Sequence, residues 1–365
     1  MILIKDICSC IEEFAPPAWQ ESWDNCGLLV GNPQQSVSNV LLTVDVTEAV
    51  VAEAFDVQAQ MIVSHHPLML AGIKQLTGNN DAQRAIALAI KNDIAIYAAH
   101  TNMDVAPGGV SFRMAAKLGL SDLQVLSPQG AGLQKLVTFI PASHFGQVRQ
   151  AVFDAGAGHI GNYDSCGYSV EGSGTFRALD GANPFVGAHG TLHTEPEIRF
   201  ETTFPSRLNR QIVAALLNSH PYEEPAFDIY ALQNADTRVG LGVVGMLPAP
   251  VSELQFLNQL KETFSMPVIR HTNLKNKKIQ RIALCGGSGS SLLSDAVRSK
   301  ADVFVTADFK YHQFADAVQD ILVADIGHFE SEQFIKEIFY DLVMKKFPNF
   351  AAYFSKVITN PINYL

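Results

Sequence analysis

Met61-Ile62-Val63-Ser64-His65-His66-Pro67 is an apolar run that ends in two histidines and a proline. A short run of this kind, bounded by a turn signal, predicts a buried strand of a parallel sheet. Two further apolar runs are followed by histidines: 94–97 precedes His100, and 321–324 precedes His328. Ligands bind outside the carboxyl ends of strands in open α/β sheets, because the loops there converge. Histidines and carboxylates at several strand ends therefore predict a divalent-metal site, with room for two ions.

The composition favours a globular protein of more than one domain. The chain has 365 residues, 47% of them hydrophobic, and a net charge of −10, which removes the electrostatic basis for binding nucleic acid. No apolar run approaches the roughly 20 residues of a membrane span, and the N-terminus shows no signal-peptide pattern. The five cysteines form no Cys-x-x-Cys pair, which argues against a disulfide framework or a thiolate zinc site. We expect a cytoplasmic protein with no membrane or nucleic-acid partner.

Strands and helices alternate on both sides of the chain's middle, which predicts βαβ units and largely parallel sheets. Before residue 125 we expect strands at 40–44, 61–64 and 94–99 and helices at 4–14, 47–56, 81–92 and 111–118. After residue 240 we expect strands at 281–284, 303–306 and 321–325 and helices at 291–299, 313–318 and a long one at 331–346.

The middle of the chain has a different pattern. We expect strands at 136–140, 167–171, 174–179, 197–204 and 226–230, with helices at 144–155 and 205–219. The order β-α-β-β-α-β with an extra hairpin is the ferredoxin-like, split βαβ arrangement. The fold class is therefore α/β, with an inserted α+β domain at 129–235. The flanking segments, 1–128 and 236–365, should build one discontinuous core.

His65 and His66 are the sharpest pair of candidate metal ligands. Neighbours on a regular strand point to opposite faces, so the pair suits one ligand on each of two neighbouring ions. Pro67 keeps His66 extended as the strand ends. Two hydrogen-bonded loop histidines are the alternative.

His328 and Glu332 stand four residues apart at the predicted start of the long helix, so they share one face. Two-metal hydrolytic sites hold their ions about 3.5–4 Å apart, and a carboxylate usually bridges them. Glu332 suits that role, with His328 on one ion, whereas Glu330 points off that face. A charge pattern typical of a helix start explains the pair equally well.

Asp104 follows the strand near His100, in a loop that Pro107-Gly108-Gly109 should keep irregular. It is a candidate carboxylate ligand, and an Asx turn is the alternative. His100 and His312 fit a role behind the ligands or a substrate contact, and equally a structural role. The loop Cys285-Gly286-Gly287-Ser288-Gly289-Ser290-Ser291 joins a strand to a helix, where amides can meet an anion, but a tight turn is the simpler interpretation.

Five segments together resemble the NIF-three-like family, the type 2 GTP cyclohydrolase I homologues, in order and spacing. They are Trp23-Asp24-Asn25-Cys26-Gly27-Leu28, Ser64-His65-His66-Pro67, His100-Thr101-Asn102-Met103-Asp104, Cys285-Gly286-Gly287-Ser288-Gly289-Ser290 and Gly327-His328-Phe329-Glu330-Ser331-Glu332. The middle is similar to that family's inserted PII/CutA-like domain through Gly156-Ala157-Gly158-His159-Ile160-Gly161-Asn162-Tyr163, Gly172-Ser173-Gly174-Thr175-Phe176 and His220-Pro221-Tyr222-Glu223-Glu224-Pro225. Ala307 and Ser331 depart from the family pattern, which has Gly and Thr there.

The resemblance implies a dinuclear metal centre with the ligands His65, His66, Asp104, His328 and Glu332, of which Glu332 bridges. It also implies a homohexamer. Nitrogen and oxygen ligands without a thiolate suit zinc, iron or manganese. The leading hypothesis is a metal-dependent hydrolase, with Glu332 in the catalytic centre, acting on a small molecule such as a nucleotide, a phosphoester or a cyclic amide. The alternative is a non-catalytic metal-handling or regulatory protein that senses a ligand through its PII-like domain.

Overall fold

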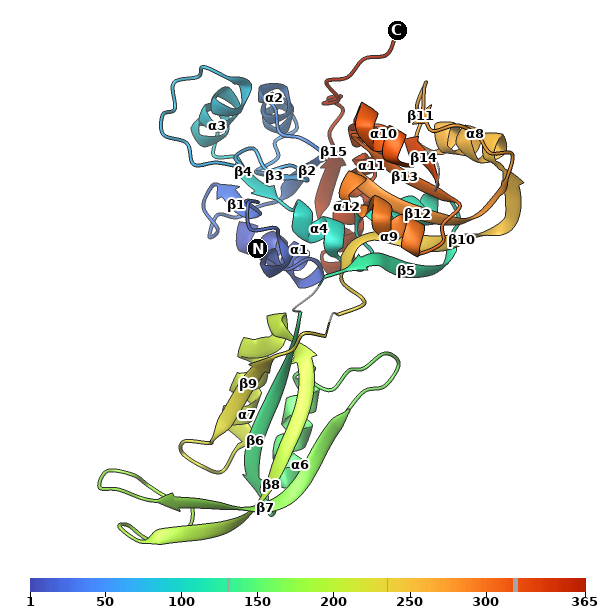
Figure 1. Cartoon of the computed structure of the whole chain (residues 1–365). Helices are drawn as coiled ribbons and strands as arrows, with labels where there is room; N and C mark the ends of the chain where they lie inside the picture. Colours follow the sequence, from blue (N-terminus) through green and yellow to red (C-terminus); the bar gives the residue numbers. More distant parts are fainter. Residues whose placement is uncertain (130–131, 235, 318–320) are drawn as a thin grey trace. The chain divides into compact units, whose positions relative to one another are not determined.

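The computed structural model describes residues 1–129, 132–234, 236–317 and 321–365, which form two compact units (Figure 1). One unit combines Met1–Pro128 with Thr237–Leu365, and the other is Gln129–Asp236. Residue 235, where we expect the insert to end, and residue 318, where we expect a helix to end, lie outside the described residues.

The first sheet of the larger unit is largely parallel, as expected. Its strand order is β1 (Gly27–Val30), β4 (Ala95–Ala98), β3 (Met61–Ser64), β2 (Asn39–Thr43) and β15 (Ala351–Phe354), and only β1 runs antiparallel to its neighbour. Every residue of β3 and β4 is buried, which explains why their sequences are continuously apolar. Helices α2 (Glu48–Asp56) and α3 (Asp81–Lys91) pack on one face through a shared apolar cluster.

The second sheet is mixed, which corrects the expectation of largely parallel sheets. Its order is β11 (Arg270–His271), β14 (Leu322–Asp325), β13 (Val303–Ala307), β12 (Lys278–Ser288), β10 (Gly240–Ser252) and β5 (Ser121–Pro128). Only β12, β13 and β14 are parallel to one another. The strands β5 and β10 flank the insert and pair antiparallel, with Pro128 opposite Gly240. The chain leaves and re-enters the core at adjacent points, and this requires opposite strand directions.

One apolar core joins the two sheets. It contains residues of α1 (Ile4–Phe14), α5 (Val110–Lys117), α8 (Glu253–Thr263) and α12 (Ile335–Lys346), together with strands of both sheets. The other face of the second sheet packs against α9 (Leu293–Arg298) and α10 (Tyr311–Ala317).

The long helix predicted at 331–346 is confirmed from Ile335 to Lys346, but its predicted start is wrong. The chain forms a short helix, α11 (His328–Glu332), before α12 begins at Ile335. Likewise, the expected loop around Asp104 contains the short helix α4 (Thr101–Val105). Both short helices directly follow strands of the two sheets, so they hold side chains at fixed positions near the strand ends.

The smaller unit is a four-stranded antiparallel sheet with two helices on one face (Figure 1). The strand order is β7 (Gly167–Arg177), β8 (Leu192–Pro205), β6 (Leu133–Pro141) and β9 (Phe227–Ala231), with α6 (Phe145–Asp154) and α7 (Asn209–Ser219). This is the expected ferredoxin-like order. The extra hairpin at 171–174 is wrong, because β7 continues through Gly172 and Gly174 and pairs residue by residue with β8.

None of the helices in the described parts of the chain has the length and apolarity needed to cross a membrane.

Candidate metal centre

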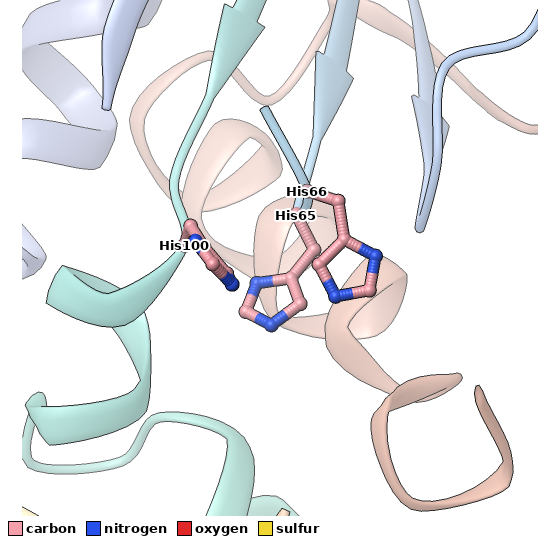
Figure 2. Close-up of side chains that lie close together, drawn as sticks. All are labelled: His65, His66 and His100. Carbon is pink, nitrogen blue, oxygen red and sulfur yellow. The ribbon is translucent and has the colours of Figure 1, made fainter. Parts of the chain in front are cut away.

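The strand ends of the larger unit bring the candidate residues together. His65 and His66 directly follow β3, and their two backbone amides share the carbonyl of Val44, at 3.1 and 2.9 Å. This shared acceptor ends the alternation of a regular strand. The two rings therefore lie side by side, with centroids 4.9 Å apart (Figure 2). Neighbouring side chains point to opposite faces only within a regular strand, and His65 and His66 lie beyond the end of β3.

One cluster consists of His65, Asp104 and Glu332, whose ligand atoms all lie within 4.8 Å of one another. His65 Nε2 is 3.6 Å from Asp104 Oδ1 and 3.7 Å from Glu332 Oε1. We call this cluster the inner half, because His65 is fully buried and only 17% of the Asp104 side chain is exposed. The short helix α4 places Asp104 here, four residues after His100.

A second cluster consists of His66, His328 and Glu332. Glu332 Oε2 lies 3.0 Å from His66 Nε2 and 3.2 Å from His328 Nε2. His328 and Glu332 belong to α11, where the four-residue spacing aligns them as predicted. We call this cluster the outer half, because 24% of the His66 side chain and 34% of the His328 side chain are exposed.

Glu332 belongs to both halves and presents one carboxylate oxygen to each. Only 3% of its side chain is exposed. Gly287, in β12, makes room for it: a Cβ there would collide with Glu332 Oε1, and the positive φ of 62° also favours glycine. The Gly287 amide donates to the Ser331 hydroxyl at 2.9 Å, which ties α11 to this strand. The glycine-rich segment therefore makes room for the Glu332 carboxylate. This explains its glycines without the bound anion considered from the sequence.

Each histidine of the two halves has an oxygen behind its Nδ1 atom. His65 Nδ1 lies 2.8 Å from the Ala99 carbonyl, His66 Nδ1 2.7 Å from Asp45 Oδ1, and His328 Nδ1 2.6 Å from Asp308 Oδ2. A proton on Nδ1 is donated to that oxygen, which leaves the Nε2 lone pair directed into the clusters. This arrangement is typical of histidines that bind metals.

The charges of the outer half are strongly coupled. Burial opposes protonation of His66, but contacts with Asp45 and Glu332 raise its pKa to about 10. Glu332 and Asp308 raise the pKa of His328 to about 9. Burial opposes ionisation of Glu332, but His65, His328 and His66 hold its pKa well below its usual range. The ion-free site therefore carries protons on imidazoles around an ionised carboxylate.

The two halves fit divalent ions by an independent criterion. Four buried side-chain atoms make no aligned hydrogen bond within the described parts of the chain, and three of them belong to the two clusters: His65 Nε2, Asp104 Oδ1 and Glu332 Oε2. Leaving such atoms unsatisfied is costly in a folded protein. A cation in the inner half would satisfy His65 Nε2 and Asp104 Oδ1, and one in the outer half would satisfy Glu332 Oε2. Nitrogen and oxygen donors suit zinc, iron or manganese. The His, Asp and Glu clusters could therefore hold metal ions.

His100 forms a third possible ligand group with His65 and His66, and a different carboxylate, Asp24, lies behind its ring. Its ring is edge-on to His65 and to His66, with both centroid distances 5.3 Å (Figure 2). Its Nδ1 is 2.9 Å from Asp24 Oδ1, and Asp24 also accepts from the Thr101 amide. His312 is in none of the clusters found among the described residues, and lies exposed on α10 against Tyr311. Glu330 points away from the clusters and accepts from Asn360 Nδ2 at 3.0 Å.

Sequence reasoning missed the acidic residues that orient the histidines. They are Asp24, Asp45 and Asp308. Asp24 stands in a segment already singled out by its motif, and Asp308 follows Ala307, which departs from the family pattern. Asp45 had no signal beyond its place after β2. Asp308 has a positive φ of 58°, but Asp adopts this conformation more readily than most residues, so it gave no separate signal of a role.

Comparison with known proteins shows the family of the chain. The family model for Duf34/NIF3 (NGG1p interacting factor 3) matches residues 2–361. A GTP cyclohydrolase 1 type 2 homolog of Halalkalibacterium halodurans is 38% identical, over 99% of this chain and 98% of the relative. One from Bacillus subtilis is also 38% identical, over 91% and 90%. The crystal structure of a Bacillus cereus protein related to NIF3 matches with a TM-score of 0.87 at 36% identity, over 100% and 99%. The chain belongs to the DUF34/NIF3 family.

Proposed function

We propose that this protein is a metal-dependent hydrolase that holds two divalent ions, one in each half of the site. The observation that carries this proposal is the placement of Glu332, with Oε1 toward His65 and Oε2 toward His66 and His328. A carboxylate shared in this way is the usual bridge of dinuclear hydrolytic sites. The inner ion would be held by His65, Asp104 and Glu332, and the outer ion by His66, His328 and Glu332. When bound, such a pair supplies Lewis acidity and an activated water near neutral pH.

The residues around the site have separate tasks in this proposal. Ala99, Asp45 and Asp308 fix the orientation of the three histidines through their Nδ1 atoms. His100, held by Asp24, presents an imidazole edge-on to the ligand histidines. That ring would hold or move a proton for a substrate bound at the site. The exposed outer half is the side from which a substrate would enter.

The chemistry of the site and the names of the relatives both favour one class of substrate. An oxygen-rich small molecule with an electrophilic carbon or phosphorus suits two Lewis-acidic ions and an activated water. The GTP cyclohydrolase 1 type 2 homologs among the relatives favour a nucleotide-like substrate, and a phosphoester or a cyclic amide is the wider class. From the family resemblance we also propose a homohexameric assembly, which sedimentation analysis would test.

The test is a turnover screen on protein loaded with zinc, iron or manganese, against GTP, other nucleotides, phosphoesters and cyclic amides. We expect turnover that a chelator removes and that the added ion restores. If a broad screen finds metal binding but no metal-dependent turnover, the hydrolase proposal fails. A non-catalytic, ligand-sensing role is then the better hypothesis, and the cavity of the smaller unit described below favours it.

A further inference from the structure

The smaller unit contains a cavity of about 880 Å³ on the face of its sheet opposite α6 and α7. Leu136, Ile140 and Phe200 point to the opposite face, where they pack with residues of α6 and α7. Phe139 and Glu197 alternate with these and line the cavity. The strand β7 and the loops at 181–185 and 222–224 complete the lining. The volume lies within the range of small-molecule sites, about 300–1,000 Å³.

Two glycines of β7 form the floor of the cavity. Gly172 and Gly174 lie on the same face of the strand, at the point where the sequence predicted a break between two strands. A Cβ on Gly174 would collide with the Glu197 carboxylate, whereas one on Gly172 would meet its nearest neighbour, the Glu197 carbonyl, at 4.0 Å. Gly174 is therefore the residue that makes room for a carboxylate at this point.

Glu197 is held in place at the floor. Only 9% of the residue is exposed. Its Oε1 accepts from the Tyr222 hydroxyl at 2.8 Å. Burial and the contact with Glu197 raise the pKa of Tyr222, so the phenol stays protonated and continues to donate. The carboxylate is thus fixed beside an aromatic ring.

Aromatic rings and further acidic groups surround this carboxylate. The Tyr222 ring centroid lies 6.1 Å from that of Phe176 and 6.3 Å from that of Phe185. The loop that carries Phe185 is tied down, because the Asn183 amide donates to Glu223 Oε2 at 2.9 Å. Four glutamates line the cavity against two arginines: Glu171, Glu197, Glu223 and Glu224 against Arg177 and Arg199. Arg199 also pairs with Glu201, which is outside the lining.

We propose that this cavity binds a small organic cation with an aromatic or apolar body. A cation placed near Glu197 gains both the carboxylate and the faces of Phe176, Phe185 and Tyr222. The excess of acidic lining residues disfavours an anion. The proposal concerns only the smaller unit and does not depend on the metal centre. The metal centre does not use the two motifs Gly172–Phe176 and His220–Pro225. In this proposal both motifs supply residues of the same binding cavity.

The test is calorimetric titration of the full-length protein with benzyltrimethylammonium, a permanent cation that has no lone pair for a metal. Benzyl alcohol and benzoate are the neutral and anionic comparisons. We expect saturable binding of the cation, weaker binding of the alcohol and no binding of benzoate. Glu197→Gln keeps the shape of the side chain and removes the charge, and it should weaken cation binding by about tenfold or more.

Gly174→Ala and Gly146→Ala form a matched pair, because Gly146 lies in α6 outside the cavity lining and a Cβ there meets nothing within 4 Å. The first displaces the Glu197 carboxylate and should weaken binding by about tenfold, whereas the second should stay within about twofold. Circular dichroism establishes that each variant is folded. Absence of saturable binding, equal binding of benzoate, or an unchanged affinity in Glu197→Gln would overturn the proposal. It would also fail if Gly174→Ala changed the oligomeric state in sedimentation and left the cation affinity unchanged, because the face would then be an interface between copies.

Discussion

The inner and outer halves of the metal centre differ in burial and in what stands behind their histidines. His65 of the inner half is fully buried, and a neutral backbone carbonyl accepts from its ring. His66 and His328 of the outer half are partly exposed, and each is backed by a carboxylate. A carboxylate makes an imidazole more basic and a stronger ligand, at the cost of competition with protons.

This difference suggests a division of labour within one site. The buried inner half has little access to solvent, so its ion would be held mainly for structure and charge. The partly exposed outer half is the side that water and a substrate would reach, and Asp45 and Asp308 would strengthen ligation by its histidines. Glu332 couples the two halves, because each ion would alter the charge that the other one meets.

The largest effect should come from Glu332→Gln. This change keeps the volume but removes the negative charge shared by both halves, so at least one ion should be lost from purified protein. Loss of one activating ion costs several kcal/mol of transition-state stabilisation, so metal-dependent turnover should fall by about a hundredfold or more. Elemental analysis and the turnover assay measure the two effects.

Glu330→Gln is the matched control for that variant. Glu330 is on the same short helix and is also buried, but it binds Asn360 and belongs to neither half. Metal content and turnover should stay near the wild-type values. If both variants lose metal equally, the effect belongs to the stability of α11 and not to a bridge.

Asp45→Asn should have a smaller effect that is confined to the outer half. It weakens the hold on His66 Nδ1 and should reduce the affinity for the outer ion by about 10- to 100-fold, while the inner ion stays bound. Competition with a metal-binding dye measures both affinities. Asp81→Asn, at an exposed helix start away from both clusters, should change neither. Equal weakening of both ions by Asp45→Asn would remove the distinction between the halves.

The pH dependence should also come from the outer half. The folded pKa values of His66 and His328 are raised to about 10 and about 9, above the ordinary value of about 6.5. The stability they add to the ion-free protein is fully present below pH 6.5 and is lost as the pH rises through 9 to 10. A bound ion must displace these protons, so metal affinity should fall as the pH falls.

Zinc titration at pH 8 in two buffers of different ionisation enthalpy measures the proton release. We expect about two protons for the wild type and about one fewer for His66→Ala. Zinc binding without proton release would show that these histidines are already deprotonated, and would contradict the coupling between Glu332 and the outer half.

The smallest effect on the metal centre should come from the insert. Both clusters lie in the larger unit, and Pro128 and Gly240 are paired neighbours. Replacing residues 129–236 with a short linker should therefore leave metal content unchanged, because the ends to be joined are already close. Metal loss from such a protein that still shows the wild-type circular dichroism of its core would place part of the site in the insert.

Local sequence rules were sufficient to single out the side chains that the fold brings together, for a physical reason. His65, His66 and Asp104 follow runs that are apolar because their strands are buried, and His328 and Glu332 obey a helical spacing that a single turn already satisfies. Strand-end and helix-face rules use only local chain geometry. These rules placed His328 and Glu332 correctly relative to each other even though the helix that carries Glu332, α11, is much shorter than predicted.

The features that escaped prediction depend on contacts between distant segments. Asp45 and Asp308 are ordinary turn residues until the fold brings His66 and His328 next to them. Gly287 resembles any glycine of a strand-to-helix turn, and only the position of Glu332 explains it. The antiparallel strands β5 and β10 follow from the closeness of the insert's two ends, which is a tertiary property.

Anomalous diffraction on crystals soaked in zinc, with elemental analysis of the same protein, tests the shared-carboxylate site most directly. Two peaks are expected, one among His65, Asp104 and Glu332 and one among His66, His328 and Glu332, with about two metals per chain. His65→Ala should remove the inner peak and leave the outer one. A single peak in the wild type, or no peak with zinc, iron or manganese, would contradict the proposal of two ions bridged by Glu332.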